Sequence, residues 1–241
     1  MAIISRRHRY LFLMAPRTGC TAIGEHVLIP DLDGEYVPAA DVIGDDGSVV
    51  VEKKHSTLRD LRRGGVVTQA EAESFLVFTT VRNPFDSLVS QYVKMRTMYA
   101  PLLDDPHSCV QRDDAYRTSM QQAAGMTFPE WVRARYVGRH VRQIGRKPTW
   151  KAPFAWAARG WAGPRHMNAA FVRDAQQVMR FERLQTDFDE VLARLGLPPH
   201  EIPQWNVTQA KGDYRDYYDD STRELVAHVF APDLRRFGYA F

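Results

Sequence analysis

One apolar run constrains the fold more than any other feature. Residues 75–81 read Phe-Leu-Val-Phe-Thr-Thr-Val, a stretch of β-branched, aromatic and aliphatic side chains with no charged residue. A run of this length and composition is typical of a strand buried on both faces. Asn83 and Pro84 follow at once, an N-cap and a first helical position, and so predict a helix that begins directly after the strand. A buried strand followed by a helix favours an α/β fold.

The same order of strand and helix recurs along the chain. We therefore expect a P-loop-like α/β fold, with a mostly parallel central sheet flanked by helices, in a single domain of residues 1–241. Residues 31–48 are rich in Asp and Gly and predict a surface loop. Further strands are predicted at residues 10–15, 49–51 and 178–181, and further helices at residues 21–28, 56–63, 128–137, 188–195 and 221–230.

Composition excludes several classes of protein. The 241 residues are 44% hydrophobic and 25% charged, which excludes a disordered tail, a fibrous repeat and a disulfide-stapled miniprotein. The net charge of +3 gives no argument for non-specific nucleic-acid binding, and the basic residues between 133 and 147 are interpreted as a solvated face, so no nucleic-acid partner is expected. Two cysteines indicate a reducing compartment. The apolar run at residues 10–15 is too short for a signal peptide or a membrane span, so we expect a cytoplasmic protein.

Residues 16–21 (Pro-Arg-Thr-Gly-Cys-Thr) link the first predicted strand to its helix. A cation, a glycine and two hydroxyls at a helix N-terminus suit an anion, because unpaired N–H groups and the helix dipole both favour negative charge. The candidate residues are Arg17, Thr18, Gly19, Cys20 and Thr21. The spacing is not that of a Walker A loop. An ordinary turn capped by one of the threonines is the alternative.

A second candidate follows the strand at residues 75–81. Arg82 offers a planar fork for phosphate at the carboxyl end of that strand. On the helix from Pro84, Ser90 falls with Asp86 and Lys94, off the apolar stripe, so its hydroxyl is expected to be open to a ligand. In the alternative interpretation, Arg82 pairs with Asp86 and Ser90 is only solvated.

A third candidate follows the strand at residues 49–51. Glu52, Lys53, Lys54 and His55 come directly after it, and we expect them to lie level with the other two loops. Two neighbouring lysines should lower the pKa of His55 and leave it neutral and basic near pH 7. A surface or capping histidine is the alternative.

Together these segments resemble the sulfotransferases that use 3′-phosphoadenosine 5′-phosphosulfate (PAPS), and most closely their carbohydrate branch. Residues 16–21 are similar to the family's P-K-x-G-C/T-T loop, and residues 81–92 to its V-R-N/D-P-F-x-R/S-L-V-S-x-Y segment. Residues 180–184 resemble its R-Y/F-E-x-L strand end, and residues 217–239 its closing pattern. The resemblance implies the sulfotransferase fold.

The resemblance also implies roles for the donor-binding residues. The loop from Arg17 to Thr21 is expected to cradle the 5′-phosphosulfate, with arginine where most members have lysine. Arg82 and Ser90 are expected to hold the 3′-phosphate. Lys211 and Gly212 weakly match a phosphate-contacting R-K-G element whose arginine is missing here.

The catalytic base is implied in two ways. Lys53 and His55 match the K-x-H element of the family's small-molecule branch, where the histidine is the base. Other carbohydrate members use a glutamate as the base, and Glu52 is the candidate for that role here. Charge on the departing nucleotide is expected to be stabilised by Arg17, by one or both of Lys53 and Lys54, and by the N–H groups of the loop. No metal is expected, because no ligand motif is present.

The acceptor expected from the resemblance is a carbohydrate hydroxyl, on a polysaccharide, oligosaccharide or glycolipid, in a bacterial cytoplasm. Tryptophans and basic residues between 147 and 161 suit a sugar-binding groove, or equally a core. An ATP-dependent small-molecule kinase and a non-catalytic nucleotide-binding module are the competing interpretations. The oligomeric state and the sulfated position are not predicted.

Overall fold

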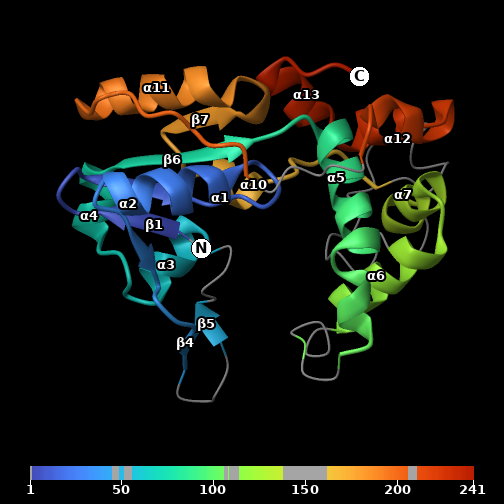
Figure 1. Ribbon diagram of the computed structural model, residues 1–241, viewed down its shortest axis with the longest axis horizontal. Coiled ribbons are helices and arrows are strands. Elements are labelled where there is room, and N and C mark those ends of the chain that lie inside the picture. Colours follow the sequence, from blue (N-terminus) through green and yellow to red (C-terminus); the bar gives the residue numbers. More distant parts are fainter. Residues whose placement is uncertain are drawn as a thin grey trace, which may run out of the picture. The chain divides into compact units, whose positions relative to one another are not determined.

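The computed structural model describes residues 2–44, 49–51, 56–105, 108, 114–137, 162–205 and 211–241. The chain forms two compact units, each built from two segments. Unit 1 comprises Met1–Arg82 and Asn168–Val207, and unit 2 comprises Asn83–Met167 and Thr208–Phe241. Each unit is described by itself (Figure 1).

Unit 1 is built on a five-stranded sheet with the strand order β3-β1-β2-β6-β7. β2, β6 and β7 are parallel, while β1 is antiparallel to both β2 and β3, so four strands share one direction. The predicted mostly parallel sheet is confirmed, with β1 as an unpredicted antiparallel member. The strands are β1 (Ala2–Ser5), β2 (Tyr10–Leu13), β3 (Glu35–Val37), β6 (Leu76–Val81) and β7 (Gln177–Arg180).

Both faces of this sheet are buried, as the apolar run predicts. Successive side chains of a strand point to opposite faces, and β2 shows this directly. Tyr10 and Phe12 pack into a core with Phe78, whereas Leu11 and Leu13 pack into a second core. All four of these β2 side chains are fully buried. Helices must therefore cover both faces.

The helical segment after β2 is continuous over residues 20–31, with a π-helical middle. Gly24 lies where a Cβ would come within 2.5 Å of the Ile3 side chain of β1, so the glycine permits the close approach of helix and sheet. Threonine capping boxes start α3 and α4. The helices of unit 1 are α1 (Cys20–Ile23), η1 (Gly24–Leu28), α2 (Ile29–Asp31), α3 (Leu58–Arg63), α4 (Gln69–Ser74), α10 (Ala169–Val172), η4 (Phe181–Arg183) and α11 (Leu184–Leu195).

Two expectations for this unit are wrong. Residues 31–48 contain β3 and β4 (Val42–Ile43) in addition to loop. β5 (Val49–Val51) forms as predicted, but it pairs with β4 in a separate two-stranded sheet. Residues 49–51 therefore do not end level with β2 and β6 in one sheet, because local pattern cannot identify the partner of a strand.

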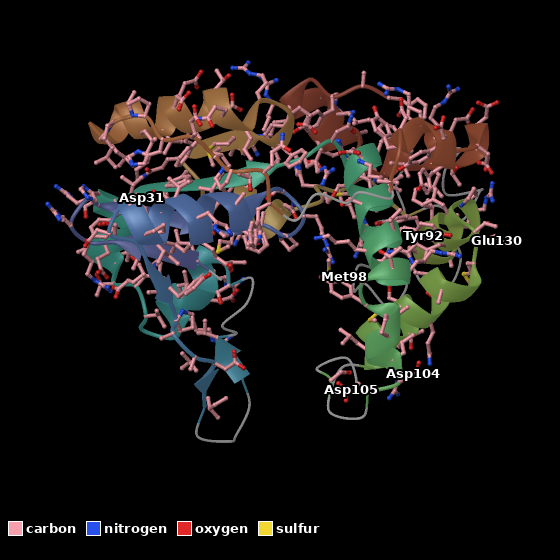
Figure 2. All side chains as sticks on the ribbon, in the orientation of Figure 1. Asp31, Tyr92, Met98, Asp104, Asp105 and Glu130 are labelled. Atoms are coloured by element: carbon pink, nitrogen blue, oxygen red, sulfur yellow. The ribbon has the colours of Figure 1, made fainter. Side chains whose placement is uncertain are left out.

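Unit 2 is helical and is held by aromatic packing. Asn83 caps α5 as predicted, its Oδ1 accepting the N–H of Phe85 at 3.1 Å. Tyr92, which is labelled in Figure 2, packs against Phe128 and Trp131 of α7. The helices in the described part of this unit are α5 (Pro84–Thr97), η2 (Ala100–Leu103), α6 (Asp114–Gly125), α7 (Phe128–Tyr136), η5 (Tyr214–Tyr217), α12 (Asp220–Val229) and α13 (Ala231–Phe237).

Membrane crossing requires a long apolar helix, about 20 residues in a typical bilayer. No helix in the described part of the chain combines that length with sufficient apolar character.

Candidate functional site

The carboxyl ends of three parallel strands meet at one edge of the unit 1 sheet. Parallel pairing of β2 with β6 and of β6 with β7 brings the segments that follow these strands together. Those segments are the loop after β2, Arg82 after β6, and residues 181–184 after β7. Open α/β sheets bind ligands at this edge. The sheet thus unites two of the predicted segments.

The loop after β2 has a backbone shaped for an anion. Arg17 has a φ of 67°, and Gly19 has φ 76° and ψ 8°, so both lie in the left-handed region. Gly19 is the N-cap of the helical segment at residues 20–31, and no side chain caps it. The first N–H groups of that segment are therefore presented to the loop, which is the arrangement that binds phosphate in other proteins.

Thr18 anchors the loop instead of capping the helix. Its buried hydroxyl donates to the carbonyl of Ala15 at 2.8 Å and is hydrogen-bonded to the Thr80 hydroxyl of β6. One strand position earlier, the Thr79 hydroxyl donates to the carbonyl of Leu13 at 2.7 Å. The alternative of a helix capped by Thr18 is therefore not observed. β6 holds the loop in place.

Arg82 is positioned by two contacts within unit 1. Its Nη1 donates to the carbonyl of Arg17 at 3.2 Å, and its Cζ lies 4.1 Å from the ring centroid of Phe181. Stacking on an aromatic face orients a guanidinium without using all of its five donors. Phe181 also limits the space beside Gly19, where a Cβ would lie 3.2 Å from its ring. The loop, Arg82 and Phe181 form one packed cluster.

Cys20 and Thr21 begin the helical segment. The Cys20 side chain is only 7% exposed, and burial raises the pKa of its thiol. A buried thiol with a raised pKa is a poor nucleophile. Thr21 is half-buried. These two residues are placed to offer backbone N–H groups, while Cys20 is not placed for covalent chemistry.

Other predicted site residues lie elsewhere or outside the described residues. Ser90 is on α5 in unit 2 and is 2% exposed, so its hydroxyl is not the open one that helical spacing predicts. Lys211 forms an ion pair with Asp86 within unit 2. Gly212 has a φ of 62°, and a Cβ added there would have no atom within 4 Å. Glu52, Lys53, Lys54 and His55 lie outside the described residues.

Sequence reasoning gave no role to Thr80 or Phe181. Thr80 stands two positions before Arg82, and Phe181 follows Arg180 at the end of β7. Both positions could have been singled out, because residues at the carboxyl ends of adjacent parallel strands are neighbours. The hydrogen bond to Thr18 and the stacking under Arg82 required the folded structure.

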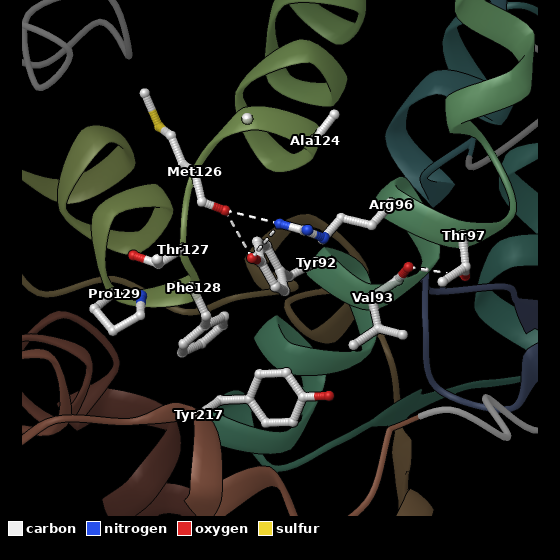
Figure 3. Close-up of a pocket in the computed structure, with 11 residues that line it drawn as sticks. Tyr92, Val93, Arg96, Thr97, Ala124, Met126, Thr127, Phe128, Pro129 and Tyr217 are labelled. Atoms are coloured by element: carbon white, nitrogen blue, oxygen red, sulfur yellow. Dashed lines mark hydrogen bonds between the residues drawn. The ribbon is translucent and has the colours of Figure 1, made fainter.

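Unit 2 contains a cavity of about 610 Å³ that sequence analysis did not predict. Arg96 lies in its wall, and its Nη1 donates to the Tyr92 hydroxyl at 2.8 Å and to the carbonyl of Met126 at 3.0 Å (Figure 3). The same nitrogen donates to the carbonyl of Ala123 at 3.2 Å. Helix α6 has no basic residue in its own last turn, so Arg96 supplies the cation for its terminal carbonyls. We therefore interpret Arg96 as structural.

Among the residues that the structure describes, no group of three or more His, Cys, Asp or Glu side chains is arranged to hold a metal ion. A sequence model with the description "Sulfotransferase family" matches residues 1–240 of the chain. No curated protein and no solved structure matches it.

Proposed function

Because this chain belongs to the sulfotransferase family, in its family 2-like branch, we propose that it transfers a sulfuryl group from PAPS to a carbohydrate hydroxyl. Family membership supports sulfuryl transfer in general. One observation carries the proposed donor site: the uncapped helix start at Gly19 lies in the same packed cluster as Arg82. An anion-binding loop beside a guanidinium suits a nucleotide that bears phosphates on two positions.

The donor residues fit such a nucleotide by their chemistry. In the proposal, the N–H groups of Cys20 and Thr21 and the side chain of Arg17 hold the 5′-phosphosulfate. Arg82 holds the 3′-phosphate, since a guanidinium can bind phosphate through two parallel hydrogen bonds. The left-handed backbone at Arg17 and Gly19 supports this assignment, because it turns successive N–H groups toward one side of the loop.

Three assignments rest on the resemblance alone. Ser90 as a second 3′-phosphate ligand requires its buried hydroxyl to exchange a protein partner for the nucleotide. Lys211 as a phosphate ligand requires its ion pair with Asp86 to open or to be shared. Gly212, at a φ of 62°, would supply a left-handed turn beside it. The reorganisation that Ser90 and Lys211 require makes them secondary to Arg82.

The proposed reaction is an in-line displacement at sulfur. The acceptor oxygen forms a bond to sulfur as the bond between sulfur and the bridging phosphate oxygen breaks, and His55 or Glu52 takes the hydroxyl proton. The products are the sulfate ester and adenosine 3′,5′-bisphosphate. Positioning and charge stabilisation dominate loose transition states of this kind. Arg17 and Lys53 would stabilise the charge that develops on the leaving phosphate.

Arginine at position 17 has a consequence for that step. Arginine side chains in general do not give up a proton in proteins, so in the proposal Arg17 acts by stabilising charge and not by donating a proton to the leaving oxygen. The leaving phosphate is already a weak base near neutral pH, so charge stabilisation is the contribution that it needs. No metal ion is part of the proposal.

Calorimetric titration tests the donor site. Adenosine 3′,5′-bisphosphate, 5′-AMP and ATP are titrated into the full chain without added metal, and we expect micromolar binding that requires the 3′-phosphate. Arg82→Ala should abolish the preference for the bisphosphate over 5′-AMP. Arg194→Ala, an exposed arginine on α11 of the same unit, is the matched control and should bind normally. Equal or absent binding of all three nucleotides would contradict the proposal.

A second pair of variants separates an enzyme from a nucleotide-binding module. His55→Ala and Glu52→Gln should each retain affinity for the bisphosphate, and the variant that lacks the base should lose transfer of labelled sulfate by about 10²–10⁴-fold. Unchanged transfer in both variants would contradict the assigned base.

A further inference from the structure

Asp187 is a buried carboxylate that the proposed reaction does not use. It lies in the first turn of α11 and is 7% exposed. Its Oδ2 accepts the backbone N–H of Arg180 at 2.7 Å and lies 3.9 Å from the Nε of the same residue. Its Oδ1 lies 3.2 Å from the Nη2 of Arg183. A carboxylate is costly to bury unless it is paired and hydrogen-bonded, and both oxygens of Asp187 meet that requirement.

These contacts hold the two ends of η4, the short turn of helix between β7 and α11. Arg180 is the last residue of β7 and the N-cap of η4, whereas Arg183 is the last residue of η4 and the N-cap of α11. In the described part of the chain, no N-cap side chain bonds to the start of either helix. A 3₁₀ turn also has poor hydrogen-bond geometry of its own. Asp187 therefore secures η4 from inside the next helix.

Through Phe181, η4 connects Asp187 to the candidate donor site. Phe181 directly follows Arg180, whose N–H is bonded to Asp187. The Phe181 ring centroid lies 4.1 Å from the Cζ of Arg82, and a Cβ added to Gly19 would lie 3.2 Å from the ring. β6 and β7 are paired in parallel up to the residues that precede Arg82 and Phe181. The position of the ring against the guanidinium therefore depends on the position of η4.

We propose that Asp187 is a positioning residue for donor recognition. By securing η4, it keeps the Phe181 ring against the Arg82 guanidinium, in the orientation that recognises the 3′-phosphate. A guanidinium binds phosphate through two parallel hydrogen bonds only when its plane faces two phosphate oxygens, and contact with a ring limits the planes that it can adopt. In this proposal Asp187 does not touch the nucleotide. The inference rests on the proposed function and adds the residue that fixes its selectivity.

A role in stability alone makes a different prediction. If Asp187 only stabilised unit 1, its loss would lower the unfolding free energy and leave the relative affinities of the folded protein for two nucleotides unchanged. A positioning role changes the ratio of the Kd of 5′-AMP to the Kd of adenosine 3′,5′-bisphosphate. We call this ratio the 3′-phosphate preference.

Calorimetric titration of the full chain with these two nucleotides tests the proposal. The test variant is Asp187→Asn, which is nearly isosteric but cannot pair as a charge with either arginine. The matched control is Asp189→Asn, which removes the same charge from the same helix, where Asp189 accepts a hydrogen bond from Gln185 at 2.8 Å. We expect Asp187→Asn to lower the 3′-phosphate preference about tenfold, the contribution of one hydrogen bond to a charged group. The control should keep the wild-type preference.

A double-mutant cycle tests whether Asp187 acts through Phe181. Phe181→Leu removes the ring and should lower the 3′-phosphate preference to a similar extent, whereas Phe181→Tyr retains the ring and should preserve the preference. Combining Asp187→Asn with Phe181→Leu should lower the preference no further than either change alone, because both act on the same contact with Arg82. Independent effects that multiply in the double variant would overturn the inference.

Thermal unfolding of each variant identifies those that are folded at the temperature of the titration. If Asp187→Asn is unfolded, Arg183→Gln replaces it and should lower the preference in the same direction, because it releases only the half-exposed end of η4. Arg194→Ala is then the control. A wild-type preference in the folded test variant would overturn the inference. A wild-type chain that binds both nucleotides equally, or neither, would overturn the proposed donor site instead.

Discussion

Arginine has different surroundings in two cavities of this protein. In unit 2, one nitrogen of Arg96 is directed at a tyrosine hydroxyl and two carbonyls, and it satisfies the end of a helix. In a cavity of about 750 Å³ beside α3 in unit 1, the guanidinium groups of Arg59, Arg62 and Arg63 have no such partner among the described residues. The difference is that backbone carbonyls at the end of α6 lie within hydrogen-bonding distance of Arg96. A cation in a cavity therefore indicates a ligand only when its donors are not already used by the fold.

The two units also differ in how the polar groups of their cavities and candidate sites are used. The candidate site of unit 1 is a backbone feature, a left-handed loop anchored to β6 through Thr18. In the unit 2 cavity, the Tyr92 hydroxyl of α5 donates to the carbonyl of Met126 at the end of α6, beside an aromatic core. Substitutions at the unit 1 site should therefore reduce ligand binding and transfer, whereas those in the unit 2 cavity should reduce stability.

The largest effect is expected at Arg17. Arg17→Ala should lower sulfuryl transfer by about 10²–10³-fold, the usual cost of removing one group that stabilises transition-state charge. Arg17→Lys should retain most of the activity, because the positive charge remains. The measurement is transfer of labelled sulfate from PAPS to a polysaccharide acceptor. The melting temperature should not change much, since the side chain is only half-buried; near-normal transfer by the alanine variant would remove Arg17 from the site.

Gly19 should show the next largest effect. Gly19→Ala should cost about 2–4 kcal/mol of unfolding free energy, because the new Cβ meets Leu184 at 2.9 Å at a φ of 76°. Gly196→Ala is the matched control, with a φ of 69° and no atom within 4 Å of the added Cβ. The control should cost about 1 kcal/mol, from backbone strain alone. Urea unfolding measures both, and equal costs would show that the contact with Leu184 is unimportant.

Arg96 tests the assignment of the unit 2 cavity. Arg96→Ala should lower the unfolding free energy by about 1–2 kcal/mol, because the carbonyls of Ala123 and Met126 lose a charged donor. Arg96→Lys should recover part of the loss. Urea unfolding gives the stability, and calorimetry should show unchanged affinity for adenosine 3′,5′-bisphosphate. A stable variant with weakened ligand binding would reverse the comparison between the two cavities.

The smallest effect concerns pH and His228 of α12. Burial lowers the pKa of His228 below its usual value of about 6.5, so the unfolded chain binds this proton more readily than the folded one. The unfolding free energy should therefore fall as the pH drops through about 6.5. His228→Gln should show a smaller fall between pH 8 and pH 5.5 than the wild type, measured by urea unfolding. Identical falls would show that His228 does not contribute.

Local patterns predicted the elements that local physics controls. The run at residues 75–81 became β6, Asn83 became the cap of α5, and the strand end at residues 16–21 became the candidate loop. In each case the deciding interactions lie within a few residues: apolar continuity, an N-cap, or a glycine at positive φ. The sequence also predicted that Arg17 and Arg82 lie at the same edge of one sheet, because each follows a strand that was expected to be parallel to the other.

The errors arose where a partner lies far along the chain. β1 was not predicted, although it pairs with both β2 and β3. β5 was assigned to the main sheet, yet it pairs with β4. Ser90 was expected to be open on α5, but it is only 2% exposed. Strand pairing and burial depend on neighbours that periodicity does not identify.

The sequence by itself determined the buried strand, the helices that follow β2, β5, β6 and β7, and the chemistry of residues 16–21 and Arg82. Only the tertiary structure decided that Thr18 bonds to Thr80, 62 positions away, and that Arg82 stacks on Phe181. It likewise decided that Arg96 serves a helix end while Arg59, Arg62 and Arg63 line the cavity beside α3. The physical reason is that residue type specifies which interactions a side chain can make, whereas the partners within reach depend on packing between distant segments.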